Sequence, residues 1–223
     1  MKRLIDAIRS TLGISRPSRT ATEMMDPDEV FFTMATLNDS LPDVDATHQP
    51  TERDLVIHED SWRQLEGISL SRETEIGEEI DEIMKVLREK SRLVGEFPVF
   101  AGMHVRKRIE NPLPSPIHWE DLLDAGGVTE ADVAGLALED EQGMIEGGFS
   151  IPLRNLTVFG IRRGNQVETL CLHLAREGGM REGDAGRVSA FFNEENLALV
   201  HWPSATVLKG GEAISLFLQG KGE

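Results

Sequence analysis

The stretch Asn155–Ala175, NLTVFGIRRGNQVETLCLHLA, carries the strongest fold signal in this chain of 223 residues. Two runs rich in β-branched and other apolar side chains, Asn155–Arg162 and Gln166–Ala175, flank the pair Gly164–Asn165. A Gly-Asn pair between two apolar segments of this kind is typical of the tight turn of a β-hairpin. We therefore expect an antiparallel pair of strands here.

The chain beyond this hairpin shows the same alternation of apolar runs and polar turns. Arg187–Phe192 is followed by Leu197–Trp202, and Ala205–Leu208 is followed by Ala213–Leu218. Each pair is separated by a short polar segment that suits a turn. Six short strands joined by short turns predict an antiparallel meander in the C-terminal half.

The clearest helix is expected at Glu73–Ser91, with Ser71 as its N-cap and Gly95 beyond its end. Acidic residues gather in its first turns and basic residues in its last turns, the order that complements the helix dipole. Its apolar residues fall on a single stripe: Ile76, Ile80, Ile83, Met84 and Leu87.

The remaining elements are shorter. A strand is expected at Leu55–His58, and Phe97–Ala101 and Met103–Ile109 suit either two strands around Gly102 or one bent strand. Helices are expected at Trp119–Ala125 and Thr129–Leu136, while Trp62–Ser69 suits either a strand or a helix. Together these elements predict an α+β fold, in which an antiparallel sheet from mainly the C-terminal half is packed by one long amphipathic helix and smaller helices.

The first 54 residues differ in composition from the rest. Residues 4–12 have the spacing of a short basic amphipathic helix, which would dock on the core or on a partner. Clusters of Ser, Thr, Pro and Asp then predict a partly mobile linker, interrupted by a possible short helix at Pro27–Leu37. We expect one compact domain from residue 55 to residue 223.

The formal net charge is −16 and the isoelectric point is near 4.8. Residues 1–20 hold five basic side chains against one acidic, so the other residues carry −20. An acidic surface repels nucleic acids and anionic membranes, and it suits either solubility or a basic protein partner. One cysteine excludes an intrachain disulfide, and no apolar run approaches the length of a membrane span, so we expect a cytoplasmic protein.

The predicted helix pair within Leu122–Leu136 resembles a helix-turn-helix in its spacing. A helix that reads DNA needs Lys or Arg for phosphates and polar groups for base edges. The second helix of this pair has acidic residues and no basic one, and no Lys or Arg occurs between Arg108 and Arg154. We therefore expect two small packed helices and no binding of nucleic acid.

One predicted strand carries an unusual basic face, formed by His104, Arg106 and Arg108. These side chains have the chemistry to bind a phosphate or carboxylate. They have an equally good partner within the chain, the Glu-rich start of the helix at 73–91. Both an anion site and internal ion pairing remain open from the sequence, with internal pairing favoured.

Two other groupings carry weaker signals. Cys171 and His173 share a face of a predicted strand, but no glycine-rich turn adjoins them to stabilise an oxyanion, and core filling is the better interpretation. His58 and Asp60 have metal-ligating side chains without the third ligand that a catalytic metal needs. We expect no metal and no cofactor.

The segment from Ile109 to Leu153 holds ten acidic side chains and no Lys or Arg. Its expected exposed loop supplies the candidate residues for a partner: Glu139, Asp140, Glu141 and Glu146. The sequence therefore favours a non-enzymatic interaction protein, either an adaptor or an inhibitor of a basic toxin, that binds through an acidic surface. The alternative is a small hydrolase or transferase whose site assembles from scattered residues.

Overall fold

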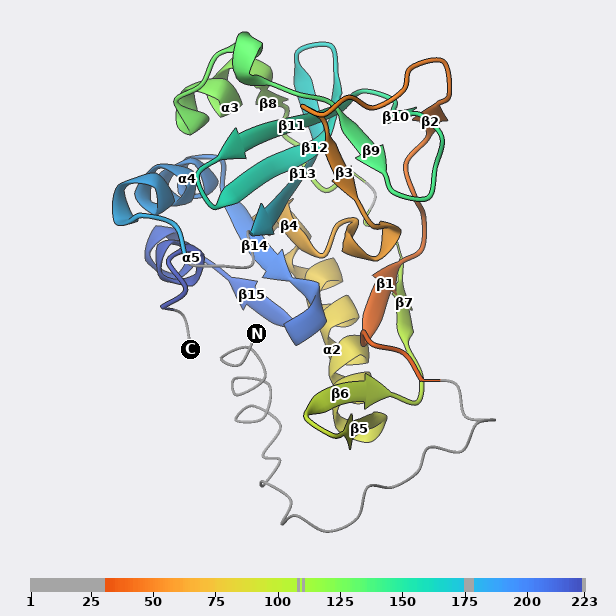
Figure 1. Ribbon diagram of the computed structural model, residues 1–223. Helices are drawn as coiled ribbons and strands as arrows, with labels where there is room; N and C mark the ends of the chain where they lie inside the picture. The colour runs from red at the N-terminus through yellow and green to blue at the C-terminus, as the bar shows by residue number, and fades with distance from the viewer. Residues whose placement is uncertain (1–30, 108, 110, 175–178, 222–223) are drawn as a thin grey trace.

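The computed structural model describes residues 31–221 except 108, 110 and 175–178. Its centre is a seven-stranded antiparallel sheet in the order β11-β12-β13-β4-β14-β15, with β8 also paired to β13 (Figure 1). The α+β prediction is confirmed. The strands of this sheet have the following bounds: β4 Leu65–Ser69, β8 Ile117–His118, β11 Gly148–Leu153, β12 Leu156–Arg163, β13 Gln166–Leu174, β14 Leu197–His201 and β15 Thr206–Leu208.

The expected hairpin at residues 155–175 is confirmed by β12 and β13. Arg163 is opposite Gln166, and Gly164 between them has a φ of 60°, a left-handed conformation that glycine adopts at no steric cost. β12 pairs on its other edge with β11, which the sequence did not predict as a strand. Three long adjacent strands therefore form one end of the sheet.

The second and third expected hairpins are wrong, because Glu182–Glu194 forms helix α4 and Gly211–Leu218 forms helix α5. In α4 the buried residues recur at the three- and four-residue spacing of a helix face, and in α5 Ile214 and Leu218 are buried four residues apart. Short apolar runs suit a strand or a buried helix equally well by pattern alone. The strands that remain from these hairpins, β14 and β15, pair with each other.

The long helix is confirmed as α2, Glu73–Glu89. The predicted N-cap, Ser71, is wrong. Arg72, directly before the first helical residue, takes the N-cap position, and no side chain makes a capping hydrogen bond to the helix. Ile76, Ile83 and Leu87 of the stripe are buried, whereas Ile80 and Met84 are only half-buried. The helix rests on Ile68, Ala198, Val200 and Trp202, so it covers one face of β4 and β14.

Helix α3, Trp119–Gly126, ends at Gly127, which has a φ of 65°. The helix expected at Thr129–Leu136 is wrong, because only one 3-10 turn forms, at Glu130–Asp132. Ala134 then bridges Ser150, and Leu136–Leu138 becomes strand β9. Pairing with distant strands overrides local helix preference here, and no helix-turn-helix is formed.

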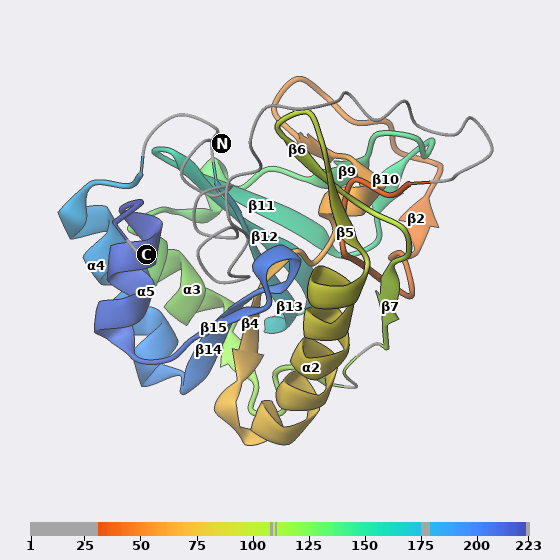
Figure 2. The same cartoon turned by 90° about the horizontal axis from the view of Figure 1, so that it is seen from below.

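The two faces of the sheet are covered differently (Figure 2). Helices α3, α4 and α5 pack on one face, around Phe149, Leu170 and Leu199. The other face is covered by α2 at one end and by strands β3, Leu55–Ile57, and β9 at the other. None of the described helices is long and apolar enough to cross a membrane.

Four two-stranded ladders surround the sheet, two of them parallel and two antiparallel. β3 runs parallel to β9, and β1, Thr36–Asn38, runs parallel to β7, His104–Arg106. β2, Val44–Asp45, is antiparallel to β10, Met144–Ile145. The hairpin of β5, Ser91–Val94, and β6, Phe97–Phe100, completes the set.

The residues on the N-terminal side of residue 55 contribute to these ladders. The possible helix at Pro27–Leu37 is wrong over its described part, because Thr36–Asn38 is strand β1. Ala35 and Thr36 are buried. The basic helix expected at residues 4–12 lies outside the described residues. A domain boundary at residue 55 stays a prediction, and truncation there would remove β1 and β2.

Candidate functional site

The loop that joins β9 to β10 carries three of the acidic residues singled out from the sequence, and the fourth, Glu146, follows directly after β10. Glu139, Asp140, Glu141 and Glu146 are all exposed. The Glu139 amide donates to the carbonyl of Ile57, so the loop is fixed to β3 at its start. The expected exposed acidic loop is therefore present.

The fold adds acidic residues that are distant in the sequence. Met144 and Ile145 of β10 pair with Asp45 and Val44 of β2, and the Glu146 amide donates to the carbonyl of Asp43 at 2.9 Å. We call the resulting surface the acidic face, which consists of six residues: Asp43, Asp45, Glu139, Asp140, Glu141 and Glu146.

Close backbone contact holds the two segments of the acidic face together. Gly143 has a φ of 137°, and a Cβ atom there would lie 2.4 Å from the carbonyl oxygen of Asp45. Only glycine permits this approach, since any side chain would collide with the backbone of β2. The loop thus has a defined position against β2.

The charge of this face follows from the two stretches that form it. Thr20–Glu52 contains no Lys or Arg, and neither does Ile109–Leu153. The β2–β10 ladder brings these two stretches side by side. Within the part of the chain that the structure describes, no Lys or Arg forms an ion pair with the acidic face.

Hydrogen bonds fix one carboxylate of this face in its charged form. Asp45 accepts from the Thr47 hydroxyl at 2.6 Å, from the Thr47 amide at 2.8 Å and from His48 Nδ1 at 3.0 Å. These bonds lower the pKa of Asp45 to about 2. At any pH near neutrality this side chain is anionic and held in one orientation.

Asp54, at the start of β3, is a second oriented carboxylate beside the face. Burial opposes its ionisation, but bonds from Thr51 and from the Gly135 amide outweigh burial and lower the pKa of Asp54. Val56, the second residue of β3, is apolar and 47% exposed. Among the described residues, strand β3 is paired only with β9.

The basic strand β7 turns its charges inward. Val105 is exposed at 51% while Arg106 is 2% exposed, the reverse of an ordinary half-buried strand. His104 Nε2 lies 2.6 Å from Glu79 of α2, which is the internal pairing that the sequence favoured. Arg108, the third candidate for an anion site, is outside the described residues.

Arg106 enters a buried network that the sequence did not reveal. Its guanidinium donates to the carbonyl of Arg63 at 3.0 Å and to Thr36 Oγ1 and Gln64 Oε1, both at 3.2 Å. It also lies 4.8 Å from the ring centroid of Trp202, a cation–π distance. Its donors are therefore used within the fold.

The acid of this network is Glu66 on β4, 1% exposed. Arg63 Nη2 lies 2.5 Å and Nε 2.7 Å from Glu66 Oε1, and Trp202 Nε1 donates to Oε2 at 3.2 Å. We call Arg63, Glu66 and Arg106 the charged seam, because they lie between the apolar cluster under α2 and the cluster under β3 and β9.

Two cations against one carboxylate leave the charged seam with one excess positive charge. Burial lowers the pKa of Arg106 to about 10, although the charge of Glu66 offsets part of this effect. Burial also disfavours the Arg63 cation, but its contact with Glu66 outweighs burial and raises the pKa of Arg63. Arg63 adopts a φ of 54°, which is uncommon for a residue with a side chain.

The remaining candidate residues are not brought into a catalytic arrangement. Cys171 is fully buried, and burial raises the pKa of its thiol well above the ordinary value. His173 is exposed at the far end of the same strand face. His58 Nδ1 accepts from the Asp60 amide at 3.1 Å, and the described residues hold no group of three potential metal ligands.

The signal for the charged seam was present but ambiguous. Glu66 stands in the run Leu65–Ser69, LEGIS, where a strand places Glu66 on the same face as the apolar Ile68, so alternation does not mark that face as polar or buried. Only the packing of α2 and β3 over that face buries the carboxylate. The joining of the two base-free stretches likewise depends on tertiary pairing.

Comparisons with known proteins give no identity to this arrangement. No family model matches the chain, no curated protein matches it, and no solved structure matches it.

Proposed function

We propose that this protein acts by binding a basic protein partner through the acidic face. The observation that carries the proposal is the joining of two stretches free of Lys and Arg into one surface. A surface that concentrates one sign of charge steers an oppositely charged partner and raises its association rate.

The construction of the face supports a docking role over a purely solubilising one. Solubility requires only dispersed charge, whereas Asp45 and Asp54 are held by several hydrogen bonds each. Val56 supplies an exposed apolar side chain on the strand that holds the loop. An apolar contact bordered by charged residues is the usual arrangement of a protein–protein interface.

The alternative, a hydrolase or transferase, needs a nucleophile within reach of a base. The sequence pair Cys171 and His173 does not supply this, because the thiol is buried and held in its neutral form. No observation on the described residues favours this alternative, so binding is the function that we develop.

The test is a pull-down from native lysate with three forms of the protein. The face reversal changes Glu139, Asp140 and Glu141 to Lys. The control reversal changes Glu78, Asp81 and Glu89 to Lys, three exposed acids of α2, and therefore alters net charge by the same amount. Circular dichroism confirms that each variant is folded.

We expect a protein that is retained by the wild type and by the control reversal at low salt. Retention should fall with the face reversal and at high salt, because salt screens exposed charges. Equal loss with both reversals would show that only net charge matters. That result, or the retention of no protein, would refute the proposal.

A further inference from the structure

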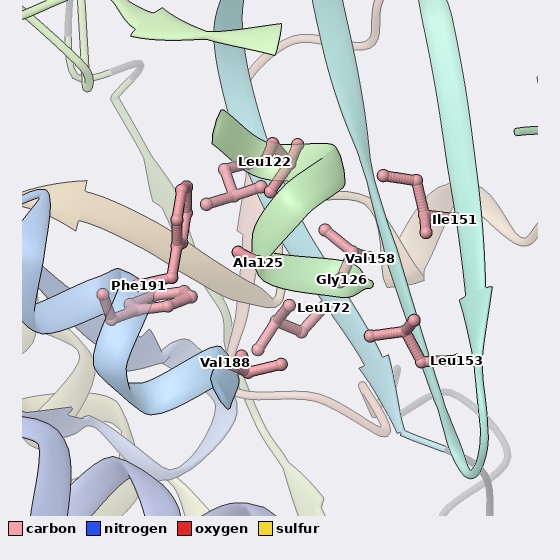
Figure 3. Close-up of a pocket in the computed structure, with 11 residues that line it drawn as sticks. Leu122, Ala125, Gly126, Ile151, Leu153, Val158, Leu172, Val188 and Phe191 are labelled. Atoms are coloured by element: carbon pink, nitrogen blue, oxygen red, sulfur yellow. The ribbon is translucent and has the colours of Figure 1, made fainter. Parts of the chain in front are cut away.

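The apolar space between helices α3 and α4 and strand β11 is part of the packed core (Figure 3). Only apolar residues line it, and it holds about 10 Å³, close to the smallest volume that admits one water molecule. No ligand therefore has room there. Among the described residues, the large apolar side chain most exposed to solvent is Phe97, 63% exposed, in the hairpin of β5 and β6.

This hairpin is apolar on both of its faces. Figure 2 shows it beyond the C-terminal end of α2. Strand β6 reads FPVF, an unbroken apolar run, which is typical of a strand that is buried on both sides. One side is indeed buried, because Phe100 is 4% exposed and belongs to the apolar cluster under α2. The pattern predicts that the other side is covered as well.

We call that other side the outer face; it is formed by Phe31, Val94, Phe97 and Val99. Val94 is opposite Phe97, and Val99 follows Phe97 at two-residue spacing, so the three side chains leave the ladder on the same side. The Phe31 ring lies 5.5 Å from the guanidinium carbon of Arg92, which is opposite Val99. Among the described residues, no member of the outer face belongs to any of the three apolar clusters.

The chain that precedes the outer face carries a second apolar surface without a known partner. The spacing of residues 4–12 predicts a basic amphipathic helix with one apolar stripe, made of Leu4, Ile5, Ile8 and Leu12. A helix of this length is marginal in water by itself and is stabilised mainly by burying its apolar side. The stripe and the outer face are therefore each stabilised if they cover each other.

The chain is long enough to bring the two surfaces together. Phe31, the first described residue, belongs to the outer face, so the preceding chain arrives at that face. The eighteen residues 13–30 connect it to the predicted helix and span at most about 60 Å when extended. Strand β6 has four residues and is only about 13 Å long. The connection can therefore return along the whole hairpin.

Charge favours docking of this segment on its own chain. Residues 1–20 carry a net charge of +4 and the other residues carry −20, so the segment is attracted to the rest of the molecule. Glu96, an exposed acid, lies in the turn of the hairpin itself. The acidic face consists of carboxylates alone and would attract basic residues without covering an apolar stripe.

From these observations we infer that residues 4–12 dock on the outer face of the same chain, with their apolar stripe against Val94, Phe97 and Val99. The hairpin then lies between α2 on one side and the N-terminal helix on the other. The docking uses no residue of the acidic face, so it does not depend on the proposed function.

The experiment is hydrogen exchange of the full chain, read by mass spectrometry over residues 4–12. A synthetic peptide of residues 1–20 gives the exchange rate of the segment without docking. We expect the segment to exchange at least about tenfold more slowly in the wild type than in the peptide, because tertiary contact protects its amides. The protection should be equal over an about tenfold range of protein concentration, since docking within one molecule does not depend on concentration.

Two variants, each with a matched control, locate the contact. Phe97→Ser should return the segment to the exchange rate of the peptide, whereas Leu216→Ser, at an exposed apolar residue of α5, should leave it protected. Ile8→Asp should abolish protection, whereas Ser10→Asp, on the opposite side of the predicted helix, adds the same charge and should leave protection in place.

The inference is overturned if the segment exchanges in the wild type as it does in the peptide, or if a variant and its control behave alike. Protection that increases with protein concentration would show docking on a second copy and would also overturn it. So would release of the segment by Lys at Glu139, Asp140 and Glu141 but not by Phe97→Ser, because the segment would then lie on the acidic face. Ile8→Asp decides the matter even if Phe97→Ser fails to fold.

Discussion

The charged seam and the acidic face place ionised groups in opposite settings. In the charged seam every residue is at most 4% exposed, and Glu66 meets both a guanidinium and the indole of Trp202. On the acidic face five of the six acidic residues are exposed and Asp45 is half-buried, and none of them meets a Lys or Arg of the described residues. The polar groups of the charged seam bond to partners from the fold, although the seam keeps one excess positive charge, whereas the carboxylates of the acidic face have no Lys or Arg partner among the described residues.

This difference indicates which charges serve the fold and which are available to a partner. A buried charge without its counter-charge is costly, so the charged seam must be complete for the chain to fold. An exposed charge costs little to leave alone. Mutations in the seam should therefore affect stability, and mutations of the acidic face should affect association.

The largest effect is expected for Glu66→Ala. The change leaves the buried guanidinium of Arg63 and the indole N–H of Trp202 without their acceptor. Loss of one partner from a buried ion pair costs about 3–5 kcal/mol in the free energy of unfolding. Urea denaturation measures this loss.

The control for that experiment is Glu73→Ala at the exposed pair of Glu73 with Lys209. Both pairs have a nitrogen–oxygen distance of 2.5 Å, so burial is the main difference between them. We expect no measurable shift of the urea midpoint for Glu73→Ala. If the two variants lose equal stability, burial is not what distinguishes the charged seam.

The next effect concerns the apolar cluster beside the seam. Ile83 of α2 is fully buried, so Ile83→Ala should lower the free energy of unfolding by about 2–5 kcal/mol. Ile80, on the same stripe, is half-buried and should lose clearly less when changed to Ala. Equal losses in thermal unfolding would mean that α2 does not lie on the sheet as described.

His201 is an intermediate case, a half-buried titratable group with no ion-pair partner among the described residues. Burial lowers the pKa of His201 to about 4 from its ordinary 6.5. Between pH 6.5 and 4 the unfolded chain therefore binds a proton that the folded chain does not, so stability falls as pH falls. The loss from this group is on the order of 3 kcal/mol.

The measurement is the free energy of unfolding of the wild type and of His201→Gln at several pH values. The variant should show a shallower decline between pH 6.5 and pH 4, with parallel curves above pH 7. Parallel curves over the whole range would show that His201 titrates alike in both states.

The sequence predicted the local elements best where a pattern was long or carried turn chemistry. The stripe of α2 and the Gly164 turn of β12 and β13 are such cases. It failed at Arg187–Phe192 and Ala213–Leu218, where short apolar runs suit a strand or a buried helix. Only packing against the sheet decides whether such a run forms a strand or a buried helix.

The candidate sites also differ in whether local sequence was enough to predict them. The acidic loop was predictable, because charge and exposure are local properties of Glu139–Glu141. The charged seam was not, because Arg106 is 43 positions from Arg63 and reaches its carbonyl only when β7 packs beside the segment that precedes β4. The addition of Asp43 and Asp45 to the acidic face likewise depends on the β2–β10 ladder.

The most direct measurement of the central claim is the association rate constant of the retained partner as a function of ionic strength. It is compared for the wild type, the face reversal and the control reversal. We expect the rate constants of the wild type and the control reversal to fall steeply and in parallel as salt increases. The face reversal should be slow at low salt and nearly independent of salt. Identical salt dependence for the two reversals would contradict the claim that binding is localised on the acidic face.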